Sequence, residues 1–131
     1  MKKAFVLVAA LCAWSTVSMA QQGLTVQYLY QACKQPAASP LGMFCFGLIR
    51  GIGTQMSVNG AELSHIKREG EAATYLAATG ICAADKRTPP DSQLIHTFLI
   101  WAQTHPERWV DHAEIGVGLA FQDAWRCEIS N

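Results

Sequence analysis

Residues 43–58, with the sequence MFCFGLIRGIGTQMSV, decide the fold class of this protein. Large apolar residues in this stretch recur every four positions: Phe44, Leu48, Ile52 and Met56. That spacing places them along one face of an α-helix. No stretch of the chain shows sustained alternation of apolar and polar residues, the pattern of a half-buried β-strand. The sequence therefore predicts an all-α protein with one of its helices over 43–58.

Glycines occur inside this predicted helix without ending its apolar pattern. Gly47, Gly51 and Gly53 each cost up to about 1 kcal/mol relative to alanine in a helix interior. Gly47 and Gly51 lie one turn apart, so we expect them to form a flat strip against which another helix packs closely. Asn59 and Gly60 then predict the end of the helix, because both residue types are favoured just after a helix terminus.

The segments on either side of 43–58 extend the helical pattern. Before it, the sequence predicts a first helix over 24–34 and a proline-containing loop over 35–41. After it, residues 61–80 are the most polar part of the chain, with a short helix predicted over 72–78. The expected fold is a small helical bundle of four to five helices.

The polar segment carries a basic cluster of His65, Lys67 and Arg68. Charged clusters usually form a solvated surface, and that interpretation stays open. Polar connecting segments also carry binding residues in many proteins. We therefore take His65, Lys67 and Arg68 as a candidate surface for a partner protein or for a second copy of the chain.

The C-terminal third predicts a helical hairpin. Thr88 is the predicted cap of the first helix, followed by two prolines in its first turn and an apolar stripe over 94–102. Thr104 and Glu107 have the spacing of a capping box and predict the start of a second helix, with an apolar face over 110–124. Because the turn between them is so short, we expect two antiparallel helices.

The N-terminus has the features of a secretory signal peptide. A positively charged start precedes an apolar run over 4–13, and Ser18-Met19-Ala20 fits a small-residue cleavage site. The apolar run is too short to span about 30 Å of hydrocarbon comfortably. We expect cleavage after Ala20, export to the periplasm, and one mature domain over 21–131 with no membrane association.

Length and composition exclude several protein classes. A chain of 131 residues allows one domain, and 50% hydrophobic with only 15% charged residues argues against a disordered protein. Cleavage removes Lys2 and Lys3 but no acidic residue, which leaves eight Lys and Arg against ten Asp and Glu, a net charge of about −2. A weakly acidic domain has no electrostatic footprint for nucleic acid, so we expect no nucleic-acid partner.

The cysteine count predicts two disulfides. Cys12 leaves with the signal peptide, and an even number remains: Cys33, Cys45, Cys82 and Cys127. Exported chains with an even cysteine count usually form disulfides, and the absence of any Cys-x-x-Cys pair disfavours zinc. Four cysteines allow three pairings. The predicted helix order favours Cys33–Cys45, at the ends of consecutive helices, and Cys82–Cys127, at the ends of the hairpin.

Catalytic motifs are absent from the sequence. There is no Gly-x-Ser-x-Gly, no P-loop and no His-Glu-x-x-His, and the histidines are scattered over different elements. His96 and His112 could approach each other across antiparallel helices, with Asp111 or Glu114 as further metal ligands. Solvated histidines are the commoner outcome at such positions. We therefore expect a protein without catalytic residues, metal or cofactor.

Tryptophans stand beside the apolar stripes of the predicted hairpin. Trp101 falls off the stripe of its helix, and Trp109 and Trp125 flank the stripe of the next. One interpretation is packing at the edge of the core. The other is a surface for a partner or a homodimer at Trp101 and Trp109, because aromatic residues are enriched at interface hot spots.

Several motifs, in this order, resemble the Rap/Tai immunity-protein family. The order is a cysteine ending the first helix, the stretch 45–51 (CFGLIRG), a cysteine before a proline-containing helix start, 98–101 (FLIW), 105–107 (HPE) and a terminal Cys127. The resemblance covers residues 24–127. Leu48 stands where the family usually has tyrosine, and residues 81–85 lack the proline often found after this cysteine.

The resemblance implies a small exported helical protein in the periplasm of Gram-negative bacteria. Members of this family neutralise peptidoglycan amidases that the type VI secretion system delivers, often as homodimers. The expected function is thus an immunity-type protein that binds a secreted amidase. A periplasmic stress chaperone, or a helical binding protein with no toxin partner, is the alternative.

Overall fold

The computed structural model describes residues 23–85 and 87–129. Five α-helices and one 3₁₀ turn follow one another along this part of the chain: α1 (Val26–Cys33), α2 (Pro40–Leu63), α3 (Gly70–Thr79), α4 (Asp91–Thr104), η1 (Pro106–Arg108) and α5 (Ala113–Ala124). In the described residues the only β-type pairing is an isolated bridge between Thr25 and His112. The predicted all-α, disulfide-stapled bundle is therefore confirmed. The predicted signal peptide, residues 1–20, lies outside the described residues.

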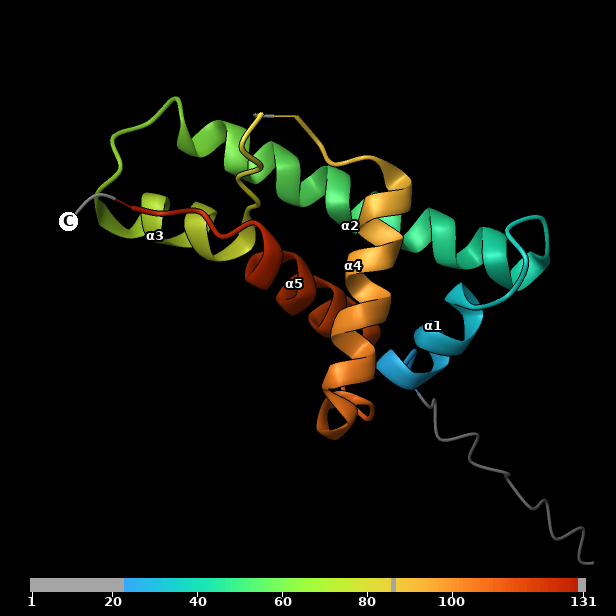
Figure 1. Cartoon of the computed structure of the whole chain (residues 1–131). Coiled ribbons are helices and arrows are strands. Elements are labelled where there is room, and N and C mark those ends of the chain that lie inside the picture. The colour runs from blue at the N-terminus through green and yellow to red at the C-terminus, as the bar shows by residue number, and fades with distance from the viewer. Residues whose placement is uncertain (1–22, 86, 130–131) are drawn as a thin grey trace, which may run out of the picture.

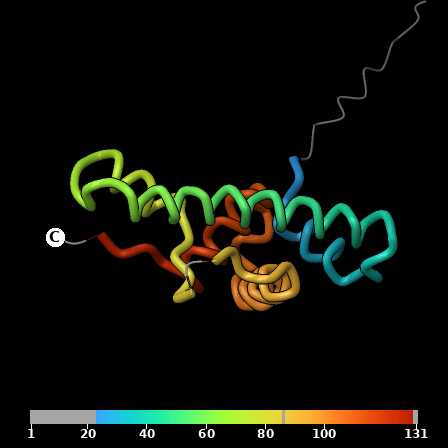
Figure 2. The backbone as a smooth tube through the Cα atoms, turned by 90° about the horizontal axis from the view of Figure 1, so that it is seen from above, coloured from blue at the N-terminus to red at the C-terminus, as the bar shows by residue number. Residues whose placement is uncertain are grey.

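Helix α2 runs the length of the molecule, with α1 at one end and α3 at the other (Figure 1). Seen from above, α4 is viewed nearly end-on, so it crosses α2 steeply (Figure 2). By length and composition alone α2 could cross a membrane, since an 18-residue window has a mean hydropathy of 1.2. It instead packs against α1, α3, α4 and α5. Part of its apolar surface is buried in the bundle, while other apolar side chains of α2, such as Met43 and Phe46, stay exposed.

The buried face of α2 differs from the face that the sequence predicted. Seven residues spaced three and four apart face the core: Gly42, Cys45, Ile49, Gly53, Met56, Gly60 and Leu63. In the predicted stripe only Met56 is buried, while Phe44 keeps 40% of its surface exposed and Leu48 and Ile52 are half-buried. Both rows have helical spacing, and the row through Cys45 faces the core because a disulfide and three small glycines lie on it.

Helix α2 is also longer than predicted at both ends. It begins at Pro40, where the Ser39 hydroxyl caps it by accepting a hydrogen bond from the Gly42 N–H at 3.1 Å. Asn59 and Gly60 do not end it, so that prediction is wrong. The Asn59 amide donates across to α3, to the Thr79 carbonyl at 3.2 Å and the Thr79 hydroxyl at 3.0 Å. Tertiary contacts with α3 thus stabilise the helix beyond Asn59 and Gly60, although this residue pair favours a helix end.

Close packing on α2 occurs at other glycines than those predicted. A Cβ added at Gly47 or Gly51 would meet no atom within 4 Å, so the expected strip of close helix packing there is wrong. A Cβ at Gly53 would lie 2.7 Å from Leu94, and one at Gly60 only 2.0 Å from the Ile81 carbonyl oxygen. The glycines that admit close neighbours are those on the buried row.

The connection between α4 and α5 is more elaborate than a hairpin turn. Pro90 occupies the position before α4, so Thr88 is not its cap, and the Thr104 hydroxyl donates back to the Ile100 and Trp101 carbonyls instead of capping a new helix. Eight residues, 105–112, then separate α4 from α5. The two helices pack together, and after this spacer α5 runs back at an oblique angle to α4, so the chain reverses direction as predicted but the helices are inclined to each other (Figure 1).

The core lies between α2 and the layer of α1, α4 and α5. Its largest fully buried side chains come from all four helices: Leu29, Ile49, Leu94, Phe98, Val117 and Phe121. Disulfides close the fold at Cys33–Cys45 and Cys82–Cys127, with Cα–Cα distances of 5.1 and 5.0 Å. Both pairings are those that the helix order favoured. A second small cluster packs Leu63 and Ala73 against Cys127 at the α3 end.

Candidate partner-binding surface

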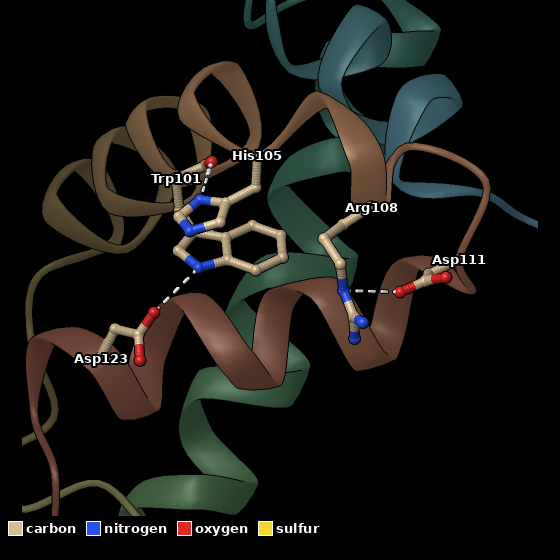
Figure 3. A network of polar contacts seen from close by, with 5 residues as sticks. All are labelled: Trp101, His105, Arg108, Asp111 and Asp123. Atoms are coloured by element: carbon tan, nitrogen blue, oxygen red, sulfur yellow. Dashed lines mark hydrogen bonds and ion pairs between the residues drawn. The ribbon is translucent and has the colours of Figure 1, made fainter.

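Trp101 is part of the core, which confirms the interpretation of packing and not that of an exposed partner surface. Only 7% of its surface is accessible, and its indole Nε1–H donates to the Asp123 carboxylate at 3.0 Å. The His105 ring stacks on the indole at 4.6 Å, and its Nδ1 lies 2.8 Å from the Trp101 carbonyl oxygen (Figure 3). His105 is therefore engaged at the end of α4, just before the connection to α5.

Trp109 is also engaged within the fold. It is half-buried, its Nε1–H donates to the Ala102 carbonyl at 2.7 Å, and its ring stacks on Tyr30 at 5.7 Å. Next to it, Arg108 and Asp111 form an ion pair at 2.8 Å across the 105–112 connection (Figure 3). The two tryptophans fix the α4–α5 connection, and the expectation of exposed aromatic rings at both is not met.

The basic residues predicted as a surface lie just after α2 and are exposed. His65 and Arg68 line one cleft, together with Arg87, which the sequence did not single out. Lys67 is exposed beside Arg68 but does not line this cleft, and neither tryptophan does. The structure thus brings two of the three predicted basic residues together and separates them from Trp101 and Trp109.

The predicted apolar stripe lies at the edge of the core, where it packs against buried residues and is partly exposed, and we call it the α2 strip. It consists of Phe44, Leu48 and Ile52, which lie one turn apart along one flank of α2. At its α1 end the Phe44 ring meets Tyr28 edge-on, with ring centroids 6.2 Å apart, and Tyr28 is itself 52% exposed. Aromatic and aliphatic side chains in such a row are typical of protein interfaces.

At its other end the α2 strip opens into a groove between α2, α3 and α5, the α2–α5 groove. Its volume is about 450 Å³, and eleven residues line it: Gly51, Ile52, Gln55, Met56, Asn59, Tyr75, Ala78, Thr79, Glu114, Gly118 and Gln122. No atom lies within 4 Å of a Cβ built at Gly51 or Gly118. The groove is therefore open where two helices each lack a side chain.

Polar side chains surround this groove. The Gln55 amide donates to the Asn59 side-chain oxygen at 3.1 Å, which aligns the donor that Asn59 sends to Thr79. Tyr75 is 64% exposed on the α3 side, and Glu114 is the one charged residue of the lining. A partly apolar groove with amide and phenol groups is suited to hold an extended protein segment and to hydrogen-bond its backbone.

The histidines and carboxylates of the described residues lie apart from one another. Among residues 23–85 and 87–129, no three His, Cys, Asp or Glu side chains are placed to hold a metal ion. His112 lies before α5, with its Nδ1 3.9 Å from the Glu114 carboxylate and its ring against Gly23. His65 and His105 lie elsewhere, in the basic cleft and on Trp101.

Comparison with known proteins gives the family of this fold. A family model described as Rap1a immunity proteins matches residues 25–127, from the N-cap of α1 to the second disulfide. The chain belongs to the Rap1a immunity protein family. The match confirms the resemblance to Rap/Tai immunity proteins. No curated protein and no solved structure shows a significant match to the chain.

In this Rap1a family member, some candidate binding residues belong to a pattern seen in the sequence and others do not. The residues of the α2 strip were found by their spacing but were assigned to the core. The groove was missed altogether, since Gly118 lies on α5 and Tyr75 on α3, far from Gly51 in sequence. Among the residues that the sequence analysis singles out, Gly51 and Ile52 do line the groove, but their pattern indicated helix packing and not a binding site.

Proposed function

We propose that residues 21–131 form an exported immunity protein that binds and neutralises a peptidoglycan amidase delivered by the type VI secretion system. The observation that carries this proposal is the family match over residues 25–127. Two disulfides support export, because such bonds persist in oxidising compartments such as the periplasm. The sequence features of 1–20 support a cleaved signal peptide.

Neutralisation by binding requires a surface that stays accessible in the folded protein. The α2 strip and the α2–α5 groove supply one, with Phe44 and Tyr75 as exposed aromatic anchors at its two ends. Aromatic residues beside a well-formed depression often carry most of the energy of an interface. We infer that the amidase contacts this surface and that no chemical step takes place on the immunity protein.

We also propose that the protein forms a homodimer through the opposite flank of α2. Met43 and Phe46 are 57% and 41% exposed there, beside a cleft of about 270 Å³ that they line with Ile95. A two-fold dimer requires a surface that complements itself. A protruding methionine next to an apolar cleft would meet that requirement, because each copy can insert its Met43 side chain into the cleft of the other copy.

The test of the immunity function compares two substitutions one helical turn apart. Gly51→Leu fills the α2–α5 groove, whereas Gly47→Leu adds the same side chain at an exposed position outside it. In cells that export a type VI amidase encoded beside the gene, we expect the wild type and Gly47→Leu to protect against lysis. Gly51→Leu should lose protection and weaken amidase binding at least about tenfold.

Three outcomes would argue against this function. Absence of binding between the wild-type protein and every neighbouring amidase would remove the proposed partner. Turnover of peptidoglycan by the purified protein, abolished by replacing a single histidine, would show an enzyme instead. Suppression of client aggregation in acid that is equal in wild type and Gly51→Leu would favour the chaperone alternative.

A further inference from the structure

The basic cleft joins chain segments that are far apart in sequence. It has a volume of about 530 Å³ and lies between the end of α2 and the segment that follows α3. His65 and Arg68 approach it from one side and Arg87 from the other. Ser57, Ser64 and Ile81 also contribute to the lining.

The lining of this cleft carries positive charge and no carboxylate. Other arginines have acidic partners: Arg50 with Asp91 at 2.9 Å, Arg108 with Asp111 at 2.8 Å and Arg126 with Asp123 at 3.8 Å. Within the part of the chain that the structure describes, no carboxylate lies within 4.0 Å of the Arg68 or Arg87 guanidinium. The nearby Asp85 carboxylate accepts a hydrogen bond from the Arg87 backbone N–H. Both guanidinium groups therefore retain donors for a ligand.

The walls of the cleft are fixed by the fold. The Ile81 N–H donates to the Met56 carbonyl at 3.0 Å, and the Cys82 N–H donates to the Trp125 carbonyl at 2.8 Å. Cys82 is also bonded to Cys127, and Arg68 Nη1 donates to the Glu128 carbonyl at 3.4 Å. A site held in this way loses little conformational freedom when a ligand enters.

We propose that the basic cleft binds an acidic surface loop of a protein partner, with carboxylates of the loop received by Arg68 and Arg87. Guanidinium groups match carboxylates in geometry as well as in charge. The concave, partly apolar lining fits a loop that inserts side chains. The mature domain as a whole is weakly acidic, with ten Asp and Glu against eight Lys and Arg in residues 21–131, so it has no general attraction to polyanionic surfaces.

This inference rests on the proposed function in one respect, since the loop is assigned to the toxin. The cleft lies beyond the α2–α5 groove, on the other side of the α2 C-terminal half, and the two share no lining residue. A toxin that engages both would contact an open groove and a charged cleft that flank the same helix. Charge complementarity at the cleft would then govern which toxin is accepted.

The experiment titrates the ¹⁵N-labelled protein, exported and purified from the periplasm, with the blocked peptide acetyl-Gly-Asp-Asp-Gly-amide. We expect amide signals of residues 64–68 and 81–85 to shift as the peptide approaches about 10 mM, a range suited to weak binding. Arg68→Glu and Arg87→Glu should each weaken binding roughly fivefold or more, because each replaces an attraction with a repulsion. Lys67→Glu is the matched control and should leave the affinity within about twofold.

Three further samples separate the alternatives. The peptide acetyl-Gly-Asn-Asn-Gly-amide should cause no shifts, and inorganic phosphate should bind no more tightly than the acidic peptide. Absence of shifts at 64–68 and 81–85, or an equal loss of affinity in Lys67→Glu, overturns the inference. So does binding to phosphatidylglycerol vesicles that Arg68→Glu and Arg87→Glu abolish, because it would make a membrane the ligand.

The same variants distinguish this inference from the immunity function. If the peptide fails to bind while the wild type still protects cells, the inference fails and the immunity function stands. If the peptide binds the cleft but no amidase binds the protein, the ligand class of the cleft stands and the toxin assignment fails. The melting temperature of Arg68→Glu and Arg87→Glu, measured beside that of the wild type, shows that each variant is folded.

Discussion

At the scale of single residues, Gly60 sets the distance between α2 and the segment that carries Cys82. Its hydrogen faces the Ile81 carbonyl oxygen, which a Cβ would approach to 2.0 Å. One turn before it, the Met56 carbonyl accepts the Ile81 N–H at 3.0 Å. Backbone meets backbone at this point, so no side chain can move aside to make room.

We expect Gly60→Ala to lower the free energy of unfolding by about 1–3 kcal/mol, because the backbone must shift to admit the methyl group. Gly47→Ala is the matched control on the same helix, where a Cβ meets no atom within 4 Å. It should raise the free energy of unfolding by up to about 1 kcal/mol, since alanine favours the helix. Urea denaturation of both variants measures these changes. Equal effects at the two positions would contradict the close approach at Gly60.

At the scale of elements, α2 carries two apolar rows with the same helical period and different roles. The row through Ile49 faces the core, with Ile49 itself at 0% exposure. The row of the α2 strip, through Ile52, lies along the flank and leads into the α2–α5 groove. One helix can therefore hold the bundle together and still present an apolar surface to a partner.

Two alanine substitutions distinguish the rows. Ile49→Ala should cost about 2–5 kcal/mol of unfolding free energy, because it leaves a cavity among fully buried side chains. Ile52→Ala should cost less than about 1.5 kcal/mol, because a half-buried isoleucine loses fewer contacts. Thermal or urea denaturation provides the comparison. A larger loss at Ile52 than at Ile49 would mean that the sequence-predicted stripe is the buried one after all.

At the scale of the whole molecule, the disulfides fasten the two ends of a fold built along α2. Cys33–Cys45 ties α1 to the start of α2, and Cys82–Cys127 ties the segment before α4 to the C-terminal tail at the α3 end. The first joins residues 12 apart in sequence and the second residues 45 apart. The longer loop restricts the unfolded chain more strongly.

Removal of the two disulfides should therefore have unequal effects. In the chain-entropy model, Cys33→Ala with Cys45→Ala costs about 3 kcal/mol, and Cys82→Ala with Cys127→Ala about 4 kcal/mol. Either loss is a large part of the usual net stability of about 5–15 kcal/mol. Equilibrium denaturation of the two double variants measures both losses of unfolding free energy. A greater loss for the Cys33 and Cys45 variant than for the Cys82 and Cys127 variant would contradict the prediction.

Self-association is the second prediction at this scale. We expect sedimentation of the exported protein to show a dimer at micromolar concentration, and Met43→Glu to shift it to monomer by placing a charge in the apolar cleft. Val110→Glu is a matched control, because Val110 is 82% exposed and lies outside that cleft. A wild-type protein that remains monomeric at high concentration, or a Val110→Glu variant that dissociates as readily as Met43→Glu, would argue against this interface.

The sequence by itself determined what depends on local order along the chain. Helical spacing over 43–58 predicted an all-α fold, and the positions of the cysteines at the ends of predicted helices ranked the two pairings that the structure contains. The ordered motifs over 24–127 indicated the family. Each of these follows from short-range periodicity or from which helix ends lie near each other when successive helices pack together.

Tertiary structure decided which residues face the core and which face solvent. Two rows on a helix can have the same spacing, and only the packing of other helices determines which row is buried. Phe44 and Ile49 both lie on helical rows, and only the neighbours from α1, α4 and α5 bury the second. Trp101 is internal because α5 crosses over it and supplies Asp123. Arg87 joins Arg68 in the basic cleft because backbone hydrogen bonds and a disulfide hold distant segments together, an arrangement that exists only once the chain has folded.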